Sequence, residues 1–190
     1  MPLCASKGET MPTLFWDIET RSGANLRDCG AYVYAIDPTT EPLCLLYAVD
    51  DNEPQLWLPA DPPPAEFTCV AADPESWKLV AHNYDFERAM LENMLVPRFR
   101  FPLISHHVQH CTQRLALANA YPAELDLLAQ ALGLPYRKDP VARKAMLAVS
   151  RPKANRKRKA TTIPIWDEDP EKLNLLYERC RLDVITTRAV

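Results

Sequence analysis

Two carboxylates one residue apart are the clearest chemical feature of this chain of 190 residues. Asp17 and Glu19 stand in FWDIET (15–20), a run of strand-forming residues. Alternate side chains of a strand share a face, so the two acids project side by side while Trp16 points the other way. Adjacent carboxylates repel, and Mg²⁺ or Mn²⁺ is the usual counter-charge. A solvated strand end is the alternative interpretation.

Two further acids lie on predicted helices. Asp183 falls on the apolar face of the last helix, where an isolated charge is costly, so it needs a cation, an arginine or a helix N-terminus as partner. Glu87 lies one turn into the helix that follows AHN (81–83). An acid there also interacts favourably with the helix dipole, which is the structural alternative for that residue.

The net charge of −3 conceals one basic segment. Ten Lys or Arg and a single acid fall between Arg137 and Lys159, and the rest of the chain carries 12 basic and 24 acidic residues. This pattern favours a metal-loaded acidic site beside a strip that binds phosphates, with Arg156 and Lys157 as candidate contacts. A flexible, solvated loop is the competing interpretation of ANRKRKA.

Size and composition indicate one domain over residues 13–190, preceded by a disordered leader over 1–12. No run reaches the roughly 18 apolar residues of a membrane span, and no secretory signal is recognisable. The six scattered cysteines form no CxxC pair, so neither a zinc site nor a disulfide framework is expected. Reduced thiols and a cytoplasmic location follow as expectations.

Strand patterns come early in the chain and helical patterns later. We expect strands over 13–17, 41–49, 54–58 and 77–81, and a helix over 85–95 that Pro97 ends. Helices are also expected over 107–118, 123–132, 141–149 and from about 170 to the end, with DEDP as the last N-cap. The pattern predicts an α/β or α+β fold around a mixed sheet.

Three motifs in order add a resemblance. DIE (17–19), NYDFE (83–87) and CRLDV (180–184) resemble the motifs of the DEDD 3′–5′ exonucleases, and residues 13–190 look like the exonuclease region of phage-type family A DNA polymerases. The resemblance implies a ribonuclease-H-like fold, a central mixed five-stranded sheet flanked by helices. It also implies that the polymerase domain is absent from this chain.

The resemblance further implies roles for individual residues. Two cations, Mg²⁺ or Mn²⁺, would be held by Asp17, Glu19, Glu87 and Asp183, while Thr20 and Asn83 would contact substrate. Arg179 is a further candidate substrate contact on its own chemistry, because a guanidinium can hold a phosphate through two hydrogen bonds. Glu87 replaces the family's usual Asp. Arg179 stands where the family has a water-orienting Tyr, and an arginine cannot act as a general base because it stays protonated.

These features predict a metal-dependent 3′–5′ exonuclease acting on single-stranded DNA 3′ ends. Its expected partner is a polymerase domain in the same polypeptide or complex. No association with a membrane is expected. The alternatives are a catalytically impaired nucleic-acid-binding domain, which Arg179 favours, and a standalone ribonuclease. No element that reads the 2′-hydroxyl is recognisable in the sequence.

Overall fold

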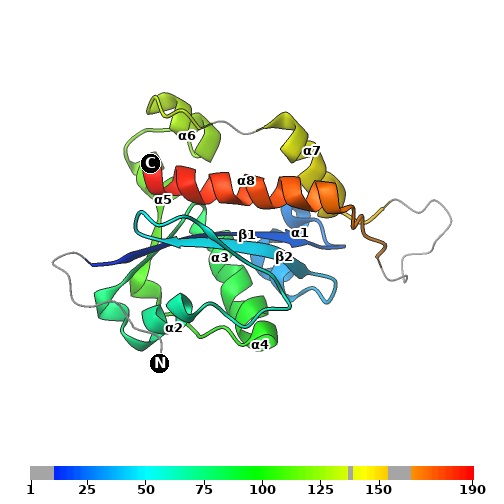
Figure 1. Ribbon diagram of the computed structural model, residues 1–190, viewed down its shortest axis with the longest axis horizontal. Helices are drawn as coiled ribbons and strands as arrows, with labels where there is room; N and C mark the ends of the chain where they lie inside the picture. Colours follow the sequence, from blue (N-terminus) through cyan, green and yellow to red (C-terminus); the bar gives the residue numbers. More distant parts are fainter. Residues whose placement is uncertain (1–10, 137–138, 154–163) are drawn as a thin grey trace.

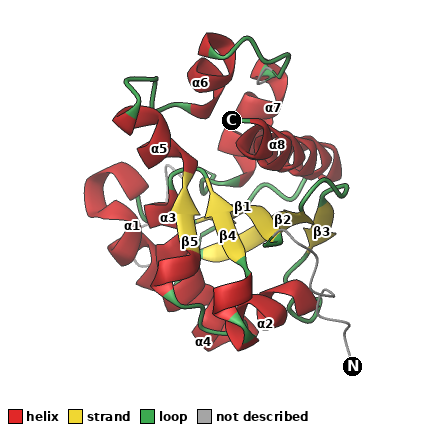
Figure 2. Cartoon of the chain, turned by 90° about the vertical axis from the view of Figure 1, so that its left-hand side faces the viewer, coloured by secondary structure: helices red, strands yellow, loops and turns green. Residues whose placement is uncertain are grey.

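A mixed five-stranded sheet forms the centre of the computed structural model, which describes residues 11–136, 139–153 and 164–190. The strand order is β3-β2-β1-β4-β5 (Figure 2). The antiparallel strands are β1 (Thr13–Arg21), β2 (Glu41–Val49) and β3 (Gln55–Trp57), and the strands parallel to β1 are β4 (Lys78–Ala81) and β5 (Gln109–Cys111). This α/β sheet with flanking helices is the arrangement expected of a ribonuclease-H-like fold.

Helices cover both faces of the sheet (Figure 1). On one face α8 (Pro170–Ala189) packs on β1 and β2 and is itself contacted by two shorter helices, α6 (Leu125–Ala131) and α7 (Pro140–Val149). α5 (Thr112–Ala118) follows β5 directly. The other face carries α1 (Leu26–Ile36), α2 (Ala65–Ala72), α3 (Tyr84–Met90) and α4 (Val96–Phe99).

Burial along β1 alternates as the sequence predicts. Leu14, Trp16, Ile18 and Thr20 are buried, while the residues between them are partly exposed. Trp16 has no exposed surface and packs edge-on against Phe67, with ring centroids 5.5 Å apart, in the larger apolar core. The two faces of β1 therefore have different roles. One face packs into the apolar core, and the other presents Asp17 and Glu19 towards α8.

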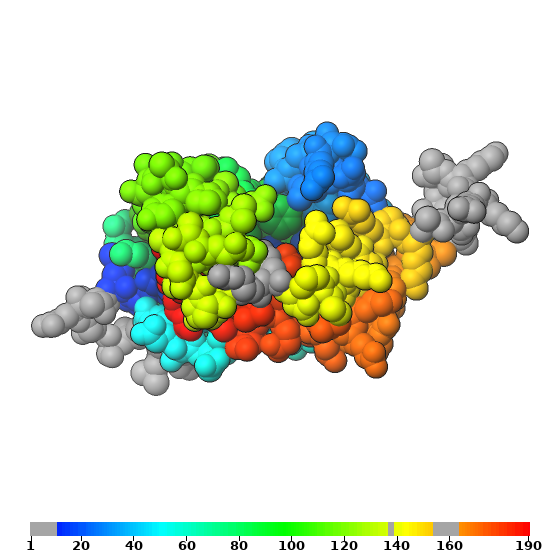
Figure 3. Space-filling model, turned by 90° about the horizontal axis from the view of Figure 1, so that it is seen from above, coloured from blue at the N-terminus to red at the C-terminus, as the bar shows by residue number. Residues whose placement is uncertain are grey.

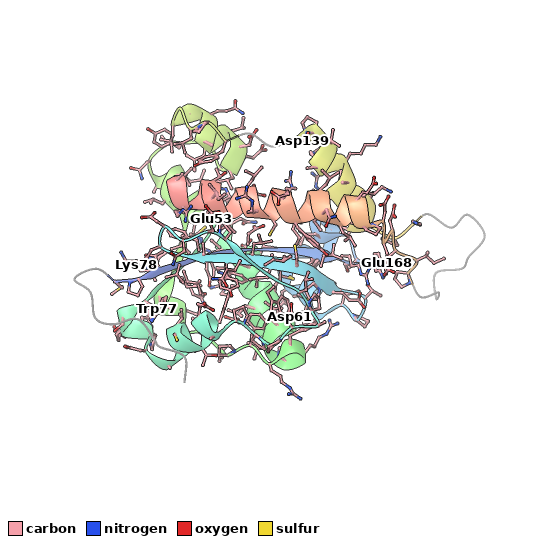
Figure 4. The ribbon with its side chains drawn as sticks, in the orientation of Figure 1. Glu53, Asp61, Trp77, Lys78, Asp139 and Glu168 are labelled. Atoms are coloured by element: carbon pink, nitrogen blue, oxygen red, sulfur yellow. The ribbon has the colours of Figure 1, made fainter. Side chains whose placement is uncertain are left out.

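Helix α8 is fixed at both ends. Asp169 caps it by accepting a hydrogen bond from the Glu171 backbone N–H at 3.0 Å, as the DEDP motif predicts. Before it, Glu168 pairs with Arg21 at the end of β1 (3.1 Å), and at the far end Arg188 donates to backbone carbonyls of the β2–β3 turn. Figure 4 labels Glu168 and Glu53 near these opposite ends. The second half of α8 thus lies over the acidic stretch of β1.

Two of the predicted helix limits are wrong. Gln109–Cys111 forms β5 rather than the start of a helix, and three residues are too few to show strand alternation. The helix predicted to stop before Pro97 does not stop there. After a π-helical turn (Leu91–Leu95) the chain continues in α4 to Phe99. Pro97 lies in the first turn of α4, where its missing N–H is tolerated. Helices α1 and α2 were not predicted.

Among the cysteines of the described ranges, one departs from expectation. Cys29, Cys44, Cys111 and Cys180 are free thiols, but Cys69 is disulfide-bonded, so the expectation of reduced thiols fails there. None of the helices in the described ranges has the length and apolar character needed to cross a membrane.

Candidate metal centre and its pocket

Three carboxylates from two elements converge on one point. Asp17 and Glu19 of β1 and Asp183 of α8 each offer an oxygen, and these oxygens all lie within 4.8 Å of one another. Asp183 is 8% exposed, on the buried face of α8 where the sequence places it. An all-carboxylate donor set suits a hard divalent cation such as Mg²⁺ or Mn²⁺, so these residues fit the metal that the resemblance implies.

Glu87 is a buried fourth acid beside this group. It is 3% exposed, and its Oε2 atom is buried with no hydrogen-bond partner. Burial, followed by the negative charge of Asp17, raises the Glu87 pKa well above its usual range. By contrast, Asp85 accepts hydrogen bonds from Arg88 and Arg114 on the surface. Glu87 rather than Asp85 is therefore the acid of this helix that could reach a cation.

The four acids line one pocket of about 510 Å³. In Figure 3 the surface is hollowed between the α5–α6 region, α1 and α7. Among the described residues, six acids and two arginines line the pocket, so carboxylates predominate there and favour the binding of cations. Its walls also include three apolar side chains from separate elements: Leu26, Phe86 and Met146.

A buried thiol donates a hydrogen bond to Asp17. The Cys180 Sγ lies 3.1 Å from Asp17 Oδ2 and 3.5 Å from the Asp17 carbonyl oxygen. Burial raises the pKa of the Cys180 thiol well above its usual range, so the thiol keeps its proton and donates it. This contact was not predicted from the sequence. The available signal was the place of Cys180 on the apolar stripe of α8, three residues before Asp183.

Arg179 borders the site, as its position one turn before Asp183 predicts. Its side chain is 12% exposed and lines the pocket. Its Nε atom lies 3.7 Å from Glu19 Oε1, an ion pair rather than a hydrogen bond. The Nε and Nη1 atoms are both buried without a hydrogen-bond partner.

The remaining predicted substrate contacts fall in different places. Asn83 is exposed, adopts a left-handed conformation (φ 62°) just before α3 and lines the same pocket. Thr20 is buried on the opposite face of β1, where its hydroxyl lies 3.0 Å from the Tyr34 hydroxyl. It lines a neighbouring pocket of about 740 Å³ instead. Arg156 and Lys157 lie outside the described residues.

His82 has a structural role. Its Nδ1 lies 2.9 Å from Thr112 Oγ1 and its Nε2 lies 2.8 Å from the Ala123 carbonyl oxygen. Both ring nitrogens therefore tie the end of β4 to α5 and to the segment before α6, which forms one wall of the pocket. His106 and His107 pair with Glu92 and Glu75 at the surface.

We expect His82→Ala to lower the free energy of unfolding by about 1–3 kcal/mol, because it removes both hydrogen bonds of the imidazole ring. Urea unfolding measures this, with His107→Ala at the surface as the control, expected to stay close to the parent. Titration with Mn²⁺ should give nearly parental affinity in the folded His82→Ala protein. Loss of Mn²⁺ binding at unchanged stability would instead make His82 a ligand.

The chain is similar in sequence to part of a phage protein. The chain is 31% identical over 186 residues to a protein named DNA polymerase from Bacillus phage SP02. The aligned region is 95% of this chain but 27% of that relative, so the chain spans about a quarter of the relative's length. No protein-family model matches the chain. What the comparison shows is a relationship to part of a phage DNA polymerase.

Proposed function

We propose that this chain is a metal-dependent 3′–5′ exonuclease that hydrolyses phosphodiester bonds at single-stranded DNA 3′ ends. The observation that carries the proposal is the convergence of Asp17, Glu19 and Asp183 within 4.8 Å, with buried Glu87 on the same pocket. The 31% identity to a phage DNA polymerase supports a role beside DNA synthesis. Editing of a polymerase's product is the activity that unites these two observations.

The proposed mechanism gives each acid a task. Asp17, Glu19 and Asp183 would hold one divalent cation, and Asp17 and Glu87 a second. Bound there, two cations supply charge stabilisation for both the attacking and the leaving oxygen of an in-line displacement. The protein's own part is to fix the carboxylates: Cys180 orients Asp17 through its 3.1 Å hydrogen bond, and the sheet holds Glu19 beside it. Neither arginine of the pocket can accept a proton, so no arginine acts as the base.

The pocket also suits the end of a single strand. Phe86 and Leu26 provide apolar surface for a base or sugar beside the acids, and exposed Asn83 offers a polar contact. Aromatic surfaces accept bases of any sequence, which an editing activity requires. We therefore assign the terminal nucleotide to this pocket, and a polymerase domain in the same polypeptide or complex as the partner that delivers it.

The direct test is incubation of a 5′-labelled single-stranded DNA with the chain in Mg²⁺ or Mn²⁺. We expect a ladder of products that shorten stepwise from the 3′ end, and no products in EDTA. An RNA of the same sequence tests the ribonuclease alternative. Absence of any shortening in either metal would contradict the proposed activity.

A second candidate function rests on Arg179. A cation 3.7 Å from Glu19 competes with metal for that carboxylate, which favours a domain that binds nucleic acid without cleaving it. Such a domain would bind the single-stranded DNA in the same experiment and leave its length unchanged. The intact group of Asp17, Glu19 and Asp183 favours the exonuclease.

The basic segment yields a separate prediction. If residues 151–159 bind phosphates along the DNA strand, neutralising Arg156, Lys157, Arg158 and Lys159 should weaken DNA binding. The slope of the logarithm of the binding constant against the logarithm of salt concentration should also become shallower, by about 0.7 per lost contact. Fluorescence anisotropy at several salt concentrations measures both. Lys78→Gln, at the exposed start of β4 (Figure 4), serves as the control. A slope unchanged by the fourfold substitution would identify the segment as a solvated loop.

A further inference from the structure

Arg179 carries hydrogen-bonding capacity that the protein itself does not use. Among the described residues it is the only one with two buried side-chain nitrogens, Nε and Nη1, that have no hydrogen-bond partner. The side chain is 12% exposed, so solvent reaches little of it. A buried donor left unpaired costs about 1–3 kcal/mol, and more for a charged group. Such a cost is relieved when a bound molecule supplies oxygens.

The surroundings of Arg179 define the chemistry of that molecule. The guanidinium lies on the pocket that Asp17, Glu19 and Asp183 also line, and its nearest acid, Glu19, stands 3.7 Å from Nε. This distance exceeds that of a hydrogen bond, so Glu19 attracts the guanidinium without satisfying the Nε–H group, and the Nη1–H groups also have no partner. Each of these two nitrogens forms a planar fork of donors with Nη2, and either fork matches two oxygens of one phosphate group.

We propose that Arg179 binds the phosphate of the 3′-terminal internucleotide linkage, the bond that is cleaved. This inference rests on the proposed exonuclease function, because it takes a phosphodiester as the occupant of the pocket. Cations held by the carboxylates would offset the charge of Glu19 and leave the guanidinium to the substrate. Arg179 is then a substrate-binding residue that contributes affinity and orientation and takes no part in proton transfer.

A coupling experiment tests the contact at one phosphate. Binding of a labelled single-stranded oligodeoxynucleotide is measured by fluorescence anisotropy in Ca²⁺, which replaces the catalytic metal. One probe is all-phosphodiester, a second has a neutral methylphosphonate at its 3′-terminal linkage, and a third has it at the fifth linkage. The proteins are the parent, Arg179→Gln, Arg179→Lys and the control Arg181→Gln, whose arginine pairs with Glu178 and does not line the pocket.

We expect Arg179→Gln and the terminal methylphosphonate each to weaken binding by about ten- to a hundredfold, the range for a charged hydrogen bond. Combined, they should weaken it by clearly less than the product of the two losses, because both remove the same contact. Arg179→Lys keeps the charge but loses the fork and should fall between parent and Arg179→Gln. Arg181→Gln, and the probe modified at the fifth linkage, should show no coupling.

Losses that multiply for Arg179→Gln and the terminal methylphosphonate would overturn the inference, as would parental affinity in Arg179→Gln. Thermal unfolding first verifies that each variant folds, and Arg179→Lys provides the same test should Arg179→Gln not fold. Failure of the proposed function has a different signature. Coupling without any cleavage by the parent in Mn²⁺ leaves Arg179 a phosphate ligand in a non-cleaving domain, whereas cleavage without coupling removes only the assignment of Arg179.

Discussion

Asp17→Ala is expected to lower the rate of 3′-end cleavage by about a thousandfold or more, equivalent to about 4 kcal/mol of barrier. Asp17 belongs to the three-carboxylate group, and its charge raises the Glu87 pKa more than the charge of Glu19 does, so in the proposed arrangement both cations share it. Charge stabilisation by bound metal contributes several kcal/mol to such reactions. The measurement is the single-turnover rate on a 5′-labelled single strand in Mn²⁺.

The matched control for this loss is Asp85→Ala. Asp85 stands on the same helix as Glu87 but pairs with Arg88 and Arg114 away from the pocket, so its removal should change the rate little. Circular dichroism establishes that both variants are folded. Undiminished cleavage by purified Asp17→Ala would show that Asp17 is not a required metal ligand, and would contradict the proposed site in which two cations share it.

Glu87→Gln is expected to stabilise the metal-free protein at pH 8 by about 1–3 kcal/mol, because it removes a buried carboxyl group that ionises more easily in the unfolded chain than in the folded protein. Burial raises the folded-state pKa of Glu87 above its value in the unfolded chain. The folded protein therefore holds a proton that the unfolded chain has released, and stability falls as pH rises from the ordinary carboxyl pKa towards the raised one. Glu87→Gln lacks this fall. The difference in free energy of unfolding between Glu87→Gln and the parent should therefore grow with pH across that interval and then stay constant.

Urea unfolding in EDTA between pH 4 and pH 9 measures this difference. Glu53→Gln is the control, because the Glu53 side chain is 89% exposed and faces an arginine, so its loss should leave the pH profile parallel to that of the parent. Adding Mg²⁺ should favour the parent over Glu87→Gln, since the cation compensates the charge of Glu87. A Glu87→Gln profile parallel to the parent's at every pH would mean that Glu87 stays solvated and uncoupled from the site.

The sequence was sufficient for the features that depend on local periodicity. Alternation in FWDIET correctly placed Asp17 and Glu19 on one face of β1, and the DEDP cap and apolar stripe correctly placed α8 with Asp183 on its buried face. Position 179 was also predicted to border the site. The five-stranded mixed sheet followed from the family resemblance rather than from the patterns alone.

The remaining features depend on contacts between distant residues, which local patterns do not encode. β5 is three residues long and exists because it pairs with β4. Thr20 is an exception, because strand alternation continued past Glu19 already points it to the face opposite the acids. The hydrogen bond between Cys180 and Asp17 joins residues 163 positions apart. Such contacts follow from the packing of α8 on the sheet.

The most direct test of the central claim is the anomalous scattering of Mn²⁺ in crystals of the chain. We expect one peak within coordination distance of Asp17, Glu19 and Asp183, and a second between Asp17 and Glu87 when a single-stranded oligonucleotide is bound. Crystals of Asp17→Ala should lack both peaks. Saturating Mn²⁺ that leaves these carboxylates without a peak, with Arg179 still paired to Glu19, would contradict a metal-dependent nuclease and favour the non-cleaving domain.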